Sequence, residues 1–148
     1  MGHKPVTDLV AQAWLSGLPG FSTGMVGAVL PQATDGWATT GFVQVQPVTG
    51  GIDPSSGLRT PHVQVDCWAV KPGSAKPPWY KANQLAETVI AATIDGTGQQ
   101  TPVDLGTHYD PARILTVVAL GEPRRVPDPD GSYARYSLDL AISWIGKG

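Results

Sequence analysis

The fold is decided by residues 132–145, SYARYSLDLAISWI, near the end of the chain. Side chains along a strand point alternately to the two faces of a sheet, so a period of two indicates a strand with one buried face. One set here is apolar and the other is mostly polar or small: Ala134, Tyr136, Leu138, Leu140, Ile142 and Trp144 against Tyr133, Arg135, Ser137, Asp139, Ala141 and Ser143. The stretch therefore predicts a long strand that covers a core with its apolar face.

Other stretches upstream also favour strands. Residues 42–48 and 62–70 alternate in the same way, residues 113–122 form a third long strand, and residues 25–30 form a short and weaker candidate. The connections are rich in turn-forming residues, and we expect loops at residues 50–61, 71–78 and 96–111. The segment PRRVPDPDG, residues 123–131, predicts the tip of a hairpin that joins the last two strands.

Two segments show the helical period instead. Residues 6–16 and 79–94 each place apolar side chains on one stripe, and Gly17 and Asp95-Gly96 follow as stop signals. The order is helix, two strands, helix, two strands, and paired strands joined by loops favour antiparallel pairing. We predict one α+β domain over residues 1–148, with a mainly antiparallel sheet of about four strands and two helices packed on one face.

The composition narrows the class of function. Charged residues make up 15% of the 148 residues, below the usual quarter or so, and the net charge is −2. A surface with few charges suits a subunit covered by neighbours, although a loop-rich surface of Ser, Thr and Gln explains it equally well. The basic residues are scattered, which argues against a sequence-specific nucleic-acid binder. No stretch is apolar enough to predict a membrane span or a signal peptide.

The sequence offers no constellation for catalysis. His3, His62 and His108 lack the close spacing of a metal site, and there is no nucleophile elbow, phosphate loop or dinucleotide fingerprint. The one cysteine, Cys67, falls in an apolar alternation and is expected to be a small buried side chain. We therefore expect a protein that is not an enzyme and holds no cofactor or metal.

Candidate contact residues come from the outward strand positions and the hairpin tip. Trp68 lies on the outward face of its strand, where it either contacts a neighbouring subunit or packs under a loop. The hairpin is the leading candidate for a contact because strand edges readily accept a partner. The predicted interface set is Trp68, Arg124, Arg125, Asp128, Asp130 and Arg135.

Three stretches resemble the tail-terminator proteins of long-tailed, siphovirus-type bacteriophages. They are HVQVDCWA (62–69), PWYKANQLAETVIAA (78–92) and RRVPDPDGSYARYSLDLAISW (124–144), with the matching positions Asp66, Trp68, Ala82, Leu85, Ala86, Tyr136, Leu138 and Leu140. The resemblance spans most of the chain. Residues 50–61 match nothing in the family and receive no role from it.

The resemblance implies a virion structural protein assembled in the host cytoplasm. Such a protein forms a ring of its own copies, in this case a hexameric one, that caps the tail-tube protein, stops its polymerisation and joins it to the head-neck connector. DNA is able to pass through such a ring. Alternatives are a neck or head-completion subunit, a tail-tube subunit, or, in a different class, a small ligand-binding or hydrolase domain.

Overall fold

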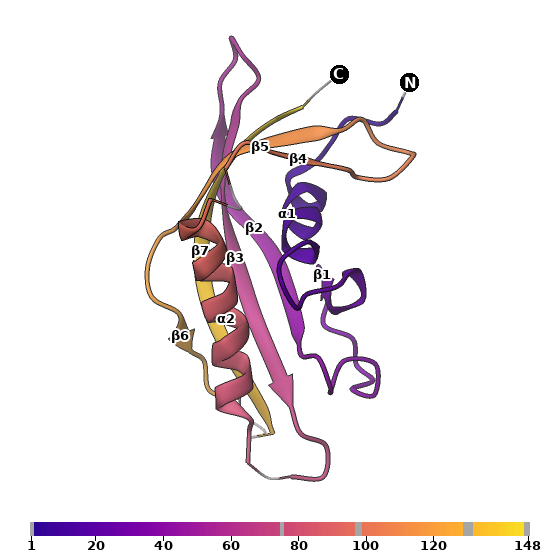
Figure 1. The fold of residues 1–148 in the computed structure, drawn as a ribbon, viewed down its shortest axis with the longest axis vertical. Coiled ribbons are helices and arrows are strands. Elements are labelled where there is room, and N and C mark those ends of the chain that lie inside the picture. Colours follow the sequence, from indigo (N-terminus) through magenta and orange to yellow (C-terminus); the bar gives the residue numbers. More distant parts are fainter. Residues whose placement is uncertain (1, 75, 97–98, 129–131, 147–148) are drawn as a thin grey trace.

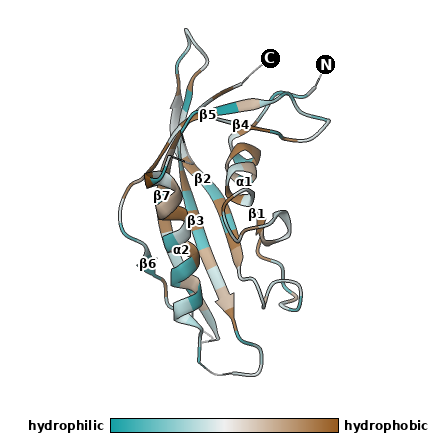
Figure 2. Cartoon of the chain, in the orientation of Figure 1, coloured by the Kyte–Doolittle hydropathy of each residue, from teal (hydrophilic) through white to brown (hydrophobic). Residues whose placement is uncertain are grey.

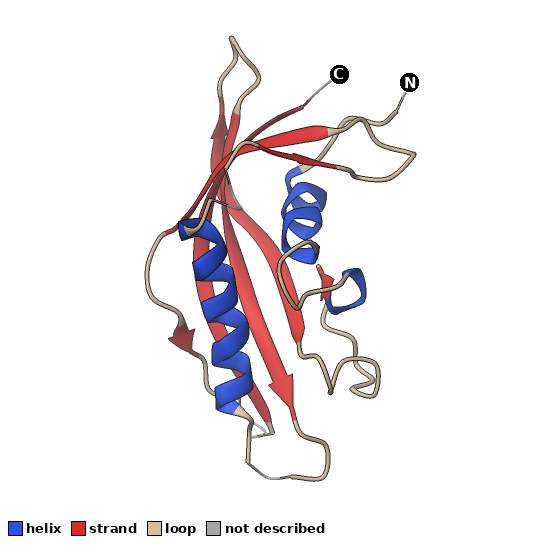
Figure 3. Ribbon diagram, viewed as in Figure 1, coloured by secondary structure: helices blue, strands red, loops and turns tan. Residues whose placement is uncertain are grey.

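A computed structural model describes residues 2–74, 76–96, 99–128 and 132–146. Helices and strands follow one another along the chain as drawn in Figure 3. Their bounds are α1 Thr7–Ser16, a 3-10 turn at Thr23–Met25, β1 Val26–Gly27, β2 Phe42–Ile52, β3 Arg59–Val70, α2 Trp79–Ile94, β4 Thr101–Val103, β5 Ala112–Ala119, β6 Arg124–Arg125 and β7 Tyr133–Gly146. The two helices occupy the predicted segments.

The sheet differs from the predicted one. It has seven strands in the order β1-β2-β3-β7-β5-β4, with β6 beside β7, and β1 pairs with β2 in parallel. The expectation of about four mainly antiparallel strands is therefore wrong, although the α+β class stands. The sheet is mixed and curled, and Figure 1 shows β4 and β5 turned across its upper end, above α1. β1 lies within the short strand predicted at residues 25–30. The unpredicted strands β4 and β6 have only two or three residues, too few to show a period of two.

The main core lies between one face of this sheet and both helices. Alternate residues of β3 and β7 meet the apolar stripes of the helices there. Its members include Val10, Trp14 and Leu15 of α1, Ala86 and Val89 of α2, and Val63, Val65, Cys67, Leu138 and Leu140 of the sheet. Figure 2 shows the alternation of apolar and hydrophilic residues along β2 and β3. The opposite face of the sheet carries polar side chains and, at one end, a smaller apolar cluster.

Half of the predicted loop over residues 50–61 belongs to strands. β2 continues to Ile52 and β3 begins at Arg59, so the two strands form a hairpin closed by a turn at residues 53–58. A Cβ on Gly50 would lie 2.4 Å from the Cα atom of Pro61, so only glycine fits that close approach. Glycine and proline weaken the strand signal, which explains the wrong prediction.

The predicted hairpin tip at residues 123–131 is also corrected in part. The chain turns back along β7 after β5: the Leu120 N–H donates to the Asp139 carbonyl oxygen (2.9 Å) and the Val126 N–H to the Arg135 carbonyl oxygen (2.9 Å). Between these two bonds lies β6, paired with β7. Residues 129–131 lie outside the described part of the chain.

Candidate functional site

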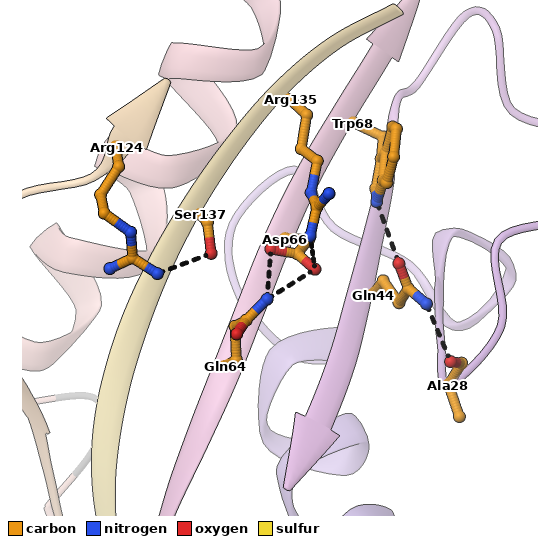
Figure 4. A network of polar contacts seen from close by, with 8 residues as sticks. All are labelled: Ala28, Gln44, Gln64, Asp66, Trp68, Arg124, Arg135 and Ser137. Carbon is orange, nitrogen blue, oxygen red and sulfur yellow. Dashed lines mark hydrogen bonds and ion pairs between the residues drawn. The ribbon is translucent and has the colours of Figure 1, made fainter. Parts of the chain in front are cut away.

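A buried ion pair organises the face of the sheet that lies opposite the helices. Asp66 is fully buried, and its carboxylate accepts hydrogen bonds from the Arg135 guanidinium (3.0 Å) and from Gln64 Nε2 (3.1 Å to each oxygen). Figure 4 shows how β3 and β7 bring these side chains together. A buried carboxylate is tolerated when it is paired and hydrogen-bonded, so Arg135 has a structural partner within its own chain.

Trp68 belongs to the same network. Its Nε1–H donates to Gln44 Oε1 (3.1 Å), and Gln44 Nε2 donates to the Ala28 carbonyl oxygen (3.2 Å), as Figure 4 shows. The Arg135 guanidinium lies 5.0 Å from the centre of the indole ring. Trp68 is thus half-buried and held by its own chain, while its contact with a neighbouring subunit stays a prediction.

A second apolar cluster covers one half of this face. The segment 28–41 lies over it, and Trp37 stacks on Tyr133 with ring centres 6.0 Å apart. The cluster comprises Trp37, Phe42 and Val70, with Leu30, Ala38, Trp68 and Tyr133 packed against them. Sequence patterns assigned Trp37 no role because it falls outside any periodic element. The other half of the face, toward the β2–β3 hairpin, has no such cover among the described residues.

The other predicted contact residues also engage their own chain. Arg124 pairs with Asp139 (3.1 Å) on the polar face, whereas Arg125 lies 4.2 Å above the Trp79 ring on the helix side. The Asp128 carboxylate accepts the Tyr133 N–H (3.0 Å), and Asp130 lies outside the described residues. These groups fasten a strap, residues 120–128, to the edge of β7. Their role in an interface remains untested.

The outer part of the β2–β3 hairpin is exposed throughout residues 46–57. We call residues 46–59 the arm. Val48 and Ile52 are each 63% exposed, and a groove of about 260 Å³ runs along the arm beside Thr7 and Arg59. Figure 1 shows the arm leaving the body at the end where the two termini lie. Because β1 pairs only with Val43 and Gln44, no described strand covers the outer edge of the arm.

A second open edge lies on the far side of the sheet. β4 pairs with β5 only over residues 112–114, so residues 116–119 of β5 have a strand on one side alone. Two apolar side chains sit beside this edge: Val118 is 50% and Leu120 48% exposed. Sequence reasoning missed both edges. The available signal was weak: residues 113–122 carry apolar side chains on both faces, which a strand with one wet face does not need.

The described residues provide little for other chemistry. They contain no group of three or more His, Cys, Asp or Glu side chains placed to hold a metal ion. None of their helices has the length and apolar character to cross a membrane. Cys67 is fully buried, and burial raises the pKa of its thiol above the ordinary value, so the thiol stays protonated.

Comparison with known proteins finds similarity among solved structures. No family model and no curated protein matches the chain. Among solved structures, the chain is similar to a chain of "Virion of native gene transfer agent (GTA) particle", with a TM-score of 0.46 and 15% sequence identity. The similarity covers 95% of this chain and 92% of that one.

Proposed function

We propose that this protein is a structural virion subunit that assembles into a ring, acting as the tail terminator of a long-tailed phage or phage-like particle. The ring, hexameric by family resemblance, caps the tail tube, ends its polymerisation and joins it to the head-neck connector. The single observation that carries the proposal is the arm, which extends beyond the core and exposes apolar side chains together with an unpaired strand edge.

The arm has apolar side chains and a strand edge that its own chain leaves uncovered among the described residues. Val48 and Ile52 are largely in water, and burying an aliphatic side chain fully stabilises by roughly 1.5–3 kcal/mol. An unpaired strand edge also favours the addition of another strand. Repeated contacts between two different patches of identical subunits close into rings when the rotation between neighbours allows it. The arm supplies one patch of this kind.

The charges of the polar sheet face are consistent with a ring through which DNA passes. Arg124 and Arg135 are each paired with a carboxylate, Asp139 and Asp66 respectively. Paired cations release fewer counterions on contact with phosphate and therefore bind DNA weakly. A surface of this type supports passage of DNA more than its retention.

The mass and shape of the purified full-length protein test the proposal. A hexamer of a 15.5 kDa chain has a mass of about 93 kDa by light scattering, and negative-stain images should show short rings. Long tubes would instead identify a tail-tube subunit. A protein that stays monomeric at every concentration and salt condition would contradict ring assembly.

Two sets of variants connect the result to specific surfaces. Val48→Lys with Ile52→Lys should reduce the particle to smaller species, whereas Val29→Lys, which changes another exposed valine away from the arm, should not. The pair Arg124→Glu and Arg125→Glu is expected to weaken assembly while the circular dichroism spectrum stays unchanged. If the assembled mass of this double variant is unchanged, the strap does not contribute to the interface.

A further inference from the structure

We propose that the open edge of β5 in one copy receives the arm strand β2 of the next copy, in antiparallel pairing. This inference rests on the proposed function and specifies the partner surface of the arm. It follows from three features of the sheet: the backbone groups at the two edges, the directions of the strands, and the side chains beside them.

The first feature is the backbone of β5. The Leu120 N–H donates to the Asp139 carbonyl oxygen (2.9 Å), so Leu120 and, by alternation, Val118 direct their backbone groups toward β7. The N–H and C=O groups of Val117 and Ala119 consequently point away from β7. No described residue pairs with them, because β4 covers only residues 112–114. The backbone groups of Val117 and Ala119 are therefore free to hydrogen-bond with an added strand.

The backbone of the arm shows the complementary state. The Asp53 N–H donates to the Leu58 carbonyl oxygen (2.9 Å) where the hairpin closes, so Asp53 faces β3. Ile52 and Gly50 therefore direct their N–H and C=O groups outward, away from β3. The two edges thus offer matching rows of donors and acceptors.

Strand direction makes the two edges compatible. Each neighbouring pair in the series β2, β3, β7 and β5 is antiparallel. The series has an even number of strands, so β2 and β5 run in opposite directions. When a rotation about a ring axis places a second copy beside the first, its β2 meets β5 in an antiparallel orientation. The same contact repeats at every junction, which a closed ring requires.

Side chains at the junction favour the same pairing. The registers place Gln46, Gln64, Asp139 and Leu120 in one row and His62, Ala141 and Val118 in the next, on the face opposite the helices. Antiparallel pairing that sets the outward groups of Gly50 and Ile52 against those of Ala119 and Val117 would lay Thr49 beside Leu120 and Gly51 beside Val118. These two half-exposed apolar side chains would then be covered. The open stretch ends where β4 begins, which limits the pairing to a few residues.

Disulfide trapping tests the pairing directly. The double variant Thr49→Cys with Leu120→Cys places one thiol at each edge. Within one chain these positions are three strand spacings apart, about 14 Å, beyond the reach of a disulfide. The native Cys67 is buried, so it should form no disulfide while the protein is folded. Oxidation should give a ladder of covalent species above the dimer on a non-reducing gel, whereas either single variant can give dimers only. Thr49→Cys with Val118→Cys samples the neighbouring register.

The outcomes separate this inference from the proposed function. A ladder from either double variant supports the β2–β5 junction. Rings of unchanged mass with no species above the dimer from both double variants would overturn the junction and leave ring assembly standing. A monomeric wild-type protein would contradict ring assembly itself. As a second measurement, Val118→Lys should lower the assembled mass, since a charge at a strand edge opposes pairing, and Val29→Lys should not.

Discussion

The two halves of the β2–β3 hairpin have the same secondary structure and opposite surroundings. In the inner half, Val45, Val63 and Val65 are buried in the main core. In the outer half, the arm, Val48 and Ile52 stand in water. One continuous pair of strands therefore contributes to folding at one end and presents an open surface at the other.

The difference shows that strand pairing and packing are separate sources of order. The arm has its ladder and a closing turn, in which the Ser55 N–H and the Ser56 hydroxyl both donate to the Asp53 carboxylate. These bonds lower the pKa of Asp53 below its ordinary value. A two-stranded hairpin without a core is marginal in water, so the arm depends on the inner half for its position. Changes in the arm should thus affect assembly and spare the fold.

The largest contrast is expected from a carboxylate placed in each half. Val65→Asp buries a charge without a partner and should abolish cooperative unfolding, or lower the unfolding free energy by several kcal/mol. Val48→Asp introduces the same group into solvent and should leave the thermal transition nearly unchanged. Thermal melts followed by circular dichroism measure both. Equal losses in the two variants would show that the arm is part of the cooperative core.

The next contrast concerns two arginines on the polar face. Arg135→Ala leaves the buried carboxylate of Asp66 with Gln64 as its remaining side-chain partner and should cost about 2–4 kcal/mol of unfolding free energy. Arg124→Ala breaks an exposed ion pair and should cost less than about 1 kcal/mol. Urea titration of both variants checks the order. A larger loss for Arg124→Ala would mean that the strap holds β7 more strongly than the Asp66 pair does.

Sequence patterns predicted the parts of this molecule that have a regular period. The apolar stripe in residues 79–94 and the alternation in residues 132–145 identified α2 and β7 because each buries one face over many residues. The same reasoning missed β4 and β6, whose pairing depends on β5 and β7 and leaves no periodic signal of its own. Short edge strands are defined by their partners, which a local pattern does not contain.

The candidate contact residues show a related limit. Arg124, Arg125 and Trp68 stood out in the sequence as charged or aromatic groups at outward positions, yet each is engaged by the same chain. Exposure depends on residues distant in sequence, such as Asp139, Trp79 and Gln44. The open edges at the arm and at β5 became visible only when strand order was known. Val48 and Val118 look like ordinary strand residues in the sequence.

A smaller effect on folding is expected from a methyl group added within the arm. Gly50→Ala places a Cβ against Pro61 and should displace the two strands, lowering the assembled mass. The unfolding free energy should change by less than about 1 kcal/mol, because the arm lies outside the core. Gly51→Ala is the matched control, since its Cβ would meet Thr60 Oγ1 at an ordinary 3.7 Å. Light scattering compares the two, and equal masses would show that the shape of the arm is irrelevant to assembly.

The last comparison measures how accessible a thiol is to a reagent in each half of the hairpin, and it requires no change in stability. Burial keeps the Cys67 thiol protonated by raising its pKa, and the thiolate is the reactive form, so a thiol reagent should modify Cys67 only as the protein unfolds. A Thr49→Cys thiol on the exposed arm should react at the rate of a free thiol in dilute, monomeric protein and more slowly once copies assemble. The ratio of its rates at low and high concentration therefore reports how far the arm is covered. Rapid labelling of Cys67 in the folded protein would show that the inner half of the hairpin opens. That result would contradict the distinction between a packed inner half and an exposed arm.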